Sequence, residues 1–129
     1  MRLVYKTIKA HLVKDEKLLL QFYNNSFKSA GLIYKTLLEE KEKGKRSTAK
    51  VVYCLKRKKV VGWGICSPHN NKKGIMLYVN KRYRRKGIGS ALFKRLAWGI
   101  PKNKVNVWPH NRLSEKFFNK NLYDKIRQS

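Results

Sequence analysis

The stretch "LYVNKRYRRKGIGSALFKRL", residues 77–96, decides the fold. It begins inside an apolar run, GIMLYVN at 74–80, which is typical of a β-strand. Ile88, Leu92 and Leu96 then recur at intervals of four, the spacing of one face of an α-helix. Between these two patterns lie several Lys and Arg residues and two glycines separated by one residue. The sequence therefore predicts a strand, a basic loop and a helix that begins directly after the loop.

The loop at 84–90 has the chemistry of a phosphate site. A helix N-terminus presents unpaired backbone N–H groups and a partial positive charge. Because glycine lacks a Cβ, the backbone at Gly87 and Gly89 can approach a bound anion closely. The dinucleotide fingerprint GxGxxG fails, because Leu92 stands where its third glycine belongs, and the Walker pattern GxxxxGK[ST] is absent. The loop favours a phosphate-bearing cofactor, and a basic face for nucleic acid is the alternative.

Charge is the unusual feature of the composition. The chain has 129 residues, which suits one domain spanning 1–129, and its 42% of hydrophobic residues argues against disorder. Lys and Arg number 32 against 7 Asp and Glu, a formal net charge of +25. An A/T-rich genome favours Lys codons, but it would also supply Asp and Glu, which are scarce here. We therefore expect a polyanionic partner, either DNA or RNA, with an acidic protein as the alternative.

Other classes of protein are disfavoured. No apolar run has transmembrane length, and the N-terminus MRLVYKTIKAH lacks the apolar stretch of a signal peptide, so we expect no membrane contact and a cytoplasmic location. Cys54 and Cys66 are too few for a disulfide framework and form no CxxC motif, so no metal site is expected. Both are predicted to be buried free thiols.

Periodicity outlines the rest of the chain as one domain without repeats. The predicted elements are a strand at 2–8, a helix after Asp15, a helix from Ser29 to Gly44, a hairpin at 50–66, a turn at 67–74, the strand at 74–80, a helix at 89–98, a strand at 104–109, a helix from Asn111 or Ser114, and a short C-terminal strand.

The 77–96 stretch resembles motif A of the GCN5-related N-acetyltransferase (GNAT) superfamily. That motif is a strand followed by [Arg/Gln]-x-x-Gly-x-[Gly/Ala] and a helix, and Arg84, Gly87 and Gly89 occupy its signature positions. The order of the predicted elements is similar over nearly the whole chain. The resemblance implies an α/β (α+β) fold with a mixed, mostly antiparallel central sheet flanked by about four helices.

The resemblance also implies an N-acetyltransferase that uses acetyl-CoA. In such proteins the pyrophosphate rests on the backbone amides of the loop, and the pantetheine arm pairs with the preceding strand. The amine acceptor attacks the thioester directly. The residues implied in cofactor binding are Leu77, Tyr78, Val79, Arg84, Arg85, Lys86, Gly87, Ile88, Gly89, Ser90 and Asn111.

The C-terminal part departs from the family pattern. Asn111 and Lys120 match a common ending, but Phe118 stands where relatives have the Tyr proposed to protonate the leaving thiolate. Because a thiol has a pKa near 8–9, water can protonate the leaving thiolate. The sequence is therefore compatible with two alternatives, an enzyme that works without that Tyr and a protein that has lost the activity. His110 is our candidate general base, and a solvent-exposed loop histidine is the alternative interpretation.

Three functions follow. The first is acetyl transfer to an amine on or near nucleic acid, and the second is transfer to a protein lysine or N-terminus. A free polyamine is the weakest acceptor, because +25 repels a cation. The third is a non-catalytic nucleic-acid- or protein-binding protein on a GNAT scaffold, which the intact RRKGIG spacing disfavours. The basic runs at 41–46 and 56–59 exceed what one cofactor needs, and we attribute them to the polyanion.

Overall fold

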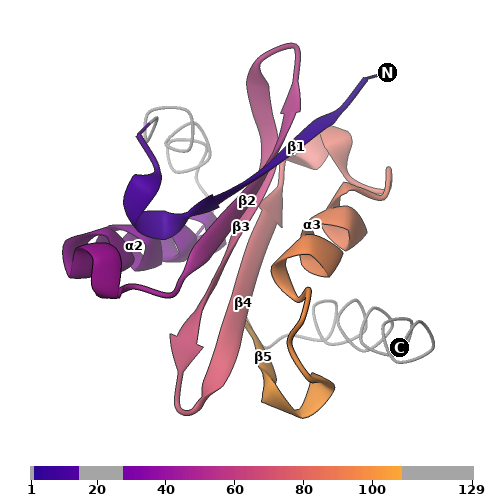
Figure 1. Ribbon diagram of the computed structural model, residues 1–129. Helices are drawn as coiled ribbons and strands as arrows, with labels where there is room; N and C mark the ends of the chain where they lie inside the picture. Colours follow the sequence, from indigo (N-terminus) through magenta and orange to yellow (C-terminus); the bar gives the residue numbers. More distant parts are fainter. Residues whose placement is uncertain (1, 15–27, 109–129) are drawn as a thin grey trace.

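A five-stranded sheet forms the centre of the molecule (Figure 1). The computed structural model describes residues 2–14 and 28–108. In the order β1-β2-β3-β4-β5, the strands are β1 (Val4–Lys9), β2 (Lys50–Lys56), β3 (Lys59–His69), β4 (Lys72–Val79) and β5 (Val105–Trp108). The first four pair antiparallel, and β5 runs parallel to β4. The expectation of a mixed, mostly antiparallel sheet is confirmed.

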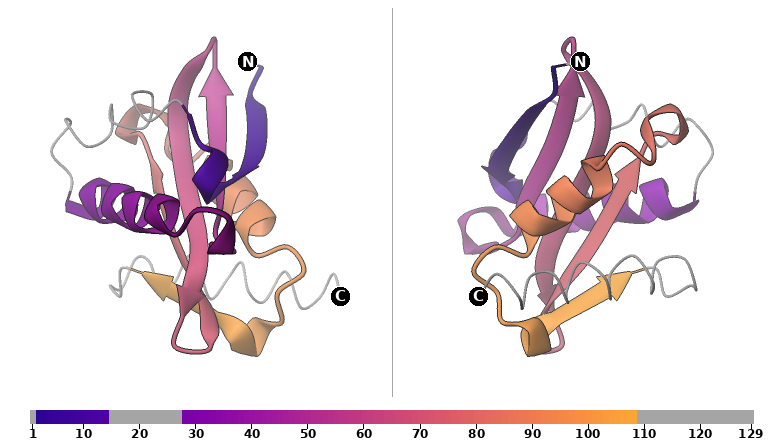
Figure 2. Two further views of the ribbon diagram at one scale, coloured as in Figure 1. Left: turned by 60° about the vertical axis from the view of Figure 1, so that its left-hand side comes forward. Right: turned by 90° about the vertical axis from the view of Figure 1, so that its right-hand side faces the viewer.

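Two helices cover opposite faces of this sheet, as the two views of Figure 2 show. They are α2 (Lys28–Lys43) and α3 (Ile88–Leu96), and short 3-10 turns lie at η1 (Ala10–Leu12), η2 (Gly44–Arg46), η3 (Lys81–Tyr83) and η4 (Lys102–Lys104). The helix predicted at 29–44 is confirmed, and it ends where Gly44 takes a left-handed φ of +59°. The two further helices expected after Asp15 and Asn111 fall outside the described residues.

The central strands β2, β3 and β4 are buried on both faces, so the core has two layers. Ile33 and Leu37 of α2 pack with Trp63 on one face, and Leu92 and Phe93 of α3 pack on the other. Double burial explains why the sequences of β2 and β3 are nearly continuous apolar runs rather than alternating ones. The Trp63 side chain is buried, and Cys54 and Cys66 are buried free thiols, as the sequence predicts for the two cysteines.

Two glycines of β3 let α3 approach the sheet closely. A Cβ added to Gly64 would lie 2.6 Å from the Met76 carbonyl oxygen and 2.7 Å from Leu96 Cδ1. One added to Gly62 would lie 3.2 Å from side-chain atoms of both Ile88 and Leu92. The helix α3 can therefore lie this close to β3 only because these two residues of the strand have no side chain.

The turn predicted at 67–74 is wrong in extent. β3 continues to His69 and β4 begins at Lys72, so the turn itself is only Asn70–Asn71. Both asparagines have positive φ values, +47° and +64°, the conformation of a two-residue type I′ hairpin turn that Asn tolerates. Pro68 pairs opposite Lys73 inside the ladder. The Pro, Asn and Lys residues of this segment are typical of a loop, but only Asn70 and Asn71 lie outside the two strands.

Candidate cofactor site

The loop after β4 is folded onto the end of its own strand. The Asn80 side chain accepts a hydrogen bond from Arg82 N at 3.1 Å, and the Tyr83 N–H donates to the Asn80 carbonyl at 2.8 Å. Arg84 Nε donates to the carbonyl of Val79, the last residue of β4, at 3.0 Å. The path of the chain from the strand to the helix is therefore held by the loop's own polar groups.

The start of α3 is open to an anion. Gly87 caps the helix with a left-handed φ of +81°, and a Cβ added there would meet no heavy atom within 4 Å. The Ala91 N–H donates to the Gly87 carbonyl at 3.0 Å, so the N–H groups of Ile88, Gly89 and Ser90 come before this first bond of the helix. No acidic residue occupies the first turn. This end of α3 can accept negative charge on its backbone N–H groups.

Several cations lie along the end of β4 and the loop that precedes α3. The Arg84 guanidinium lies 5.4 Å from the centre of the Tyr78 ring, and Lys86 Nζ lies 5.8 Å from the centre of the Tyr83 ring. Lys56 Nζ lies 5.1 Å from the same Tyr83 ring. Lys56 belongs to the basic run at 56–59, which we expect to contact a polyanionic partner. The structure places its first member beside the loop, a proximity that depends on the tertiary fold and has no signal in the sequence.

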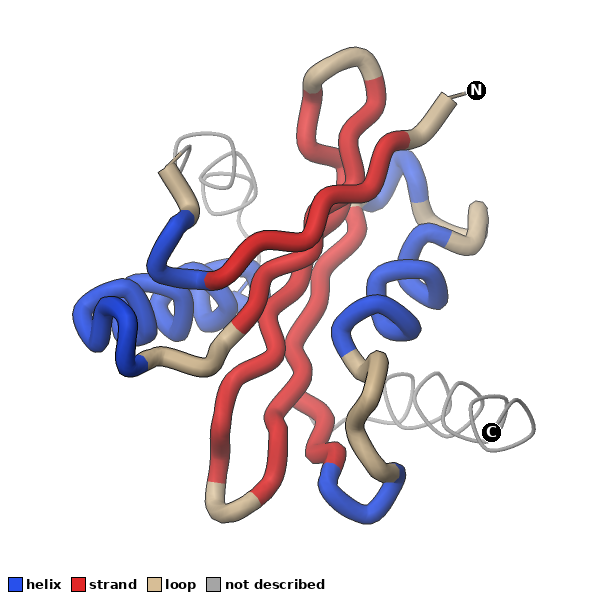
Figure 3. The backbone as a smooth tube through the Cα atoms, in the orientation of Figure 1, coloured by secondary structure: helices blue, strands red, loops and turns tan. Residues whose placement is uncertain are grey.

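The last residues of β4 extend beyond the strand that pairs with its outer edge. Leu77, Tyr78 and Val79 pair with β3 on one side. On the other side β5 pairs only with Lys73 to Met76, so no strand of the described chain continues along 77–79 (Figure 3). This part of the β4 edge, beyond the last pair with β5, leads directly into the loop. An extended molecule that contains amide groups can add along such an edge as a further strand.

The structure brings together most of the residues implied in cofactor binding. The edge at 77–79, the loop at 84–87 and the first turn of α3 at 88–90 are continuous along one path. Arg84 has a positioning role that the sequence did not reveal, because its Nε fastens the loop to Val79. His110 and Asn111 lie outside the described residues, so their roles remain predictions.

Residues 2–14 and 28–108 contain neither a candidate metal site nor a candidate membrane-spanning helix. No group of three or more His, Cys, Asp or Glu side chains is placed to hold a metal ion. None of the helices described is long and apolar enough to span a bilayer.

Comparison with known protein families assigns this chain to one of them. The model of the acetyltransferase (GNAT) domain matches residues 47–126. The chain belongs to the GNAT family. No curated protein sequence matches this GNAT chain.

Solved structures share the GNAT fold at low sequence identity. A Desulfovibrio desulfuricans protein assigned to the GNAT acetyltransferases aligns with a TM-score of 0.70 at 11% identity, over 93% of this chain and 84% of its own. A Clostridium acetobutylicum protein predicted to be an acetyltransferase, solved with acetyl-CoA, aligns with a TM-score of 0.63 at 12% identity, over 92% and 88% of the two chains. The PaiA N-acetyltransferase of Thermoplasma acidophilum, in complex with coenzyme A, aligns with a TM-score of 0.60 at 16% identity, over 94% and 89%.

Proposed function

We propose that this protein is an N-acetyltransferase that uses acetyl-CoA and acts directly on an amine acceptor found on or near nucleic acid. One observation carries the proposal: the part of the β4 edge that extends beyond β5 leads into a basic loop, and this loop leads into the N-terminus of α3. Acetyl-CoA supplies the thioester whose carbonyl carbon the acceptor amine attacks. Solved relatives with coenzyme A or acetyl-CoA share the fold, which supports this choice of cosubstrate.

The chain's own groups bind and orient. The N–H groups at 88–90 would hold the pyrophosphate of acetyl-CoA, and Arg85 and Lys86 add positive charge to the same loop. The edge at 77–79 offers hydrogen bonds to the amides of the pantetheine arm. Holding the thioester and the acceptor amine in one complex turns an encounter of two molecules into a step within that complex, which lowers the barrier to reaction.

Proton transfer falls to groups outside β4. That strand, KKGIMLYV, carries no Asp, Glu or His. His110, which follows β5 in the sequence, stays our candidate for accepting the amine proton. Phe118 has no proton to donate, so we assign protonation of the leaving thiolate to water.

Charge supports an acceptor near nucleic acid. No Asp or Glu occurs between Glu42 and Glu115, the part of the chain that holds the candidate cofactor site. Such a surface attracts polyanions and repels free cationic amines. An amine carried by nucleic acid, or by a protein bound to it, meets both conditions. A protein lysine or N-terminus away from nucleic acid is the alternative acceptor.

Isothermal titration with CoA and acetyl-CoA tests the cofactor claim. Gly87→Glu places a carboxylate at the start of α3, and we expect it to abolish binding. Gly44→Glu is a matched control, because Gly44 also has a positive φ and no heavy atom within 4 Å of its added Cβ, but it lies at the end of α2. The control is expected to bind like wild type. No binding heat from wild type at millimolar CoA would overturn the proposal.

Transfer of radiolabelled acetyl groups then tests the acceptor. We expect incorporation into nucleic acid or into proteins bound to it. Incorporation only into free proteins would move the proposal to the alternative acceptor. CoA binding without transfer to any of these would indicate a non-catalytic GNAT scaffold.

A further inference from the structure

Trp98, two residues beyond α3, is unusually exposed. Its relative exposure is 81%, whereas the other large apolar side chains exposed by the described residues, Val4, Leu12 and Leu38, range from 38% to 48%. A tryptophan ring presented to water in this way offers a large flat surface that a partner can cover.

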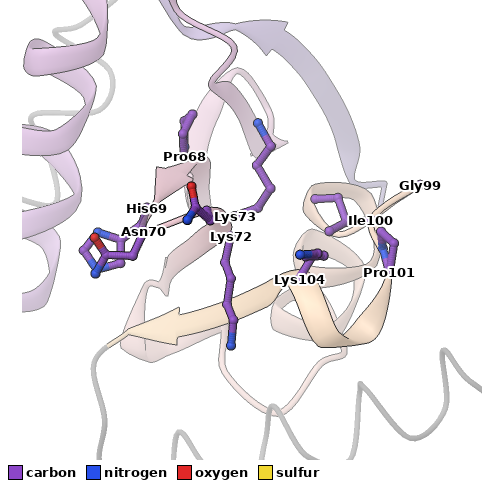
Figure 4. A pocket seen from close by; sticks show the side chains of 10 residues that line it. Pro68, His69, Asn70, Lys72, Lys73, Gly99, Ile100, Pro101 and Lys104 are labelled. Atoms are coloured by element: carbon purple, nitrogen blue, oxygen red, sulfur yellow. The ribbon is translucent and has the colours of Figure 1, made fainter.

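A hollow lies on either side of the chain at Trp98. The first, of about 440 Å³, is lined by Thr7, Lys50, Lys94, Arg95 and Trp98 itself. The second, of about 600 Å³, begins at the next residue, Gly99. Figure 4 shows that its lysines come from two elements: Lys72 and Lys73 belong to the β3–β4 hairpin, and Lys104 belongs to η4, which precedes β5.

Both hollows open on the face of the sheet that α3 covers. Val52 and Ile75 pack under α3, and Lys50 and Lys73 each lie two residues earlier on the same strands. Side chains two apart on a strand share a face. We name the set Trp98, Lys50, Lys73, Lys94, Arg95 and Lys104 the Trp98 surface.

The Trp98 surface has no acidic neighbours among the described residues. The Asp and Glu side chains in that part of the chain are Glu39, Glu40 and Glu42, all on α2, which covers the opposite face. A surface with cations and no counter-charge is complementary to a chain of phosphates.

The cations project from ordered elements. The Arg95 guanidinium lies 4.5 Å from the centre of the Tyr5 ring on β1, and Lys73 Nζ donates to Thr48 Oγ1 at 3.1 Å. Tyr5 in turn is hydrogen-bonded to Cys54 in the core of the sheet. A stacked guanidinium keeps its plane and its donors oriented, so Arg95 is held in place before a ligand binds.

We infer that the Trp98 surface binds single-stranded nucleic acid, with the Trp98 ring stacked on a base and the cations contacting phosphates on both sides. The inference deepens the nucleic-acid part of the proposed function and rests on it. A single strand offers the unpaired base face that an exposed ring needs, whereas a duplex keeps its bases stacked inside. One exposed ring beside hollows that are lined by lysines lacks the broad apolar face with which a helix binds a lipid surface.

The Trp98 surface is separate from the cofactor site. The nine residues of α3 span about 14 Å, and Trp98 follows the end opposite to Gly87. Nucleic acid and cofactor can therefore bind together, and changes in one site should leave the other intact.

Fluorescence anisotropy with a labelled 12-mer oligo(U), and with a duplex of equal length, tests the inference. We expect the single strand to bind more tightly, and Trp98→Ala to weaken it about 10-fold, within the range for loss of one stacked base. Trp98→Phe should restore part of the affinity. Leu38→Ala removes an exposed apolar side chain from α2 and is expected to bind like wild type.

Charge variants test the cations separately. Gly99→Glu puts a carboxylate between the two hollows and should weaken oligo(U), whereas the matched Gly44→Glu should not, because each glycine has a positive φ and open space. Lys50→Gln and Lys94→Gln should each flatten the log–log salt dependence by about 0.7. Lys35→Gln, on α2, should leave it unchanged. Thermal unfolding and CoA titration of every variant identify loss of folding.

Three results would overturn the inference. The first is Trp98→Ala binding oligo(U) within two-fold of wild type. The second is tighter binding of the duplex with the same response to the variants, which would indicate backbone electrostatics without stacking. The third is Trp98-dependent binding of phosphatidylserine vesicles with Trp98-independent binding of RNA, which would assign the ring to a membrane. Absence of CoA binding with these RNA results intact would overturn only the acetyltransferase proposal.

Discussion

Replacing Gly64 by Ala measures how tightly α3 is held on the sheet. The added methyl group would lie 2.6 Å from the Met76 carbonyl oxygen, 2.7 Å from Leu96 Cδ1 and 2.8 Å from Leu77 Cβ. The carbonyl belongs to a paired strand and cannot rotate away, and Leu96 is fully buried. The strands or the helix must therefore shift. Overpacking of this kind costs about 1–3 kcal/mol, and we expect the free energy of unfolding to fall by about 2 kcal/mol.

Gly74→Ala is the matched control on the neighbouring strand. An added Cβ there would lie 3.5 Å from His69 Cβ and 3.6 Å from the Ser67 carbonyl oxygen, which is ordinary contact. Its φ is not positive, so we expect stability to rise by about 0.4–1 kcal/mol through restriction of the unfolded chain. Urea unfolding followed by circular dichroism gives both values. A Gly64→Ala protein as stable as Gly74→Ala would refute the close approach of β4 and α3 to Gly64.

Three further predictions concern titrating groups. Burial and the hydrogen bond to Cys54 raise the pKa of Tyr5 to about 12, above the ordinary value near 10, so its contribution to stability is present below pH 10 and is lost between pH 10 and 12. Tyr5→Phe should lose less stability than wild type over that window, and an equal loss would contradict this. Burial also raises the pKa of the Cys54 thiol, so native protein should react with Ellman's reagent far more slowly than urea-unfolded protein, and equal rates would count against it. His110→Ala should lower kcat about 10²-fold, and an unchanged rate and pH profile would exclude His110 as the base.

Elements with a strong period were predictable from sequence. The apolar positions Ile88, Leu92 and Leu96 are all buried against the sheet, as their helical spacing indicates. The apolar runs of β2 and β3 likewise predicted a hairpin, which is confirmed. In these segments the residues that the local pattern marks as apolar are the ones that the fold buries, so the pattern alone predicts the element and its buried face.

Features that depend on contacts between distant segments were not predictable. The helix predicted to reach Trp98 ends at Leu96, and only the folded chain shows that the Trp98 ring is exposed beside Lys50 from another strand. The approach of Lys56 and Lys86 to one Tyr83 ring is of the same kind. Each charged run looks like a solvated turn by itself, and its neighbours come from elsewhere in the sequence.

The hydrogen bonds of the 80–84 loop have a consequence for the kinetics of ligand binding. The Asn80 side chain, the Tyr83 N–H and Arg84 Nε already hold the loop before any ligand arrives. Its conformational entropy is therefore lost when the chain folds and not when a ligand is captured. Loss of the Arg84 tether should slow association as well as weaken affinity, because a loosened loop must first find its shape. Rapid mixing would separate this effect from loss of charge, since Arg84→Lys keeps the cation but not the guanidinium Nε that donates to Val79.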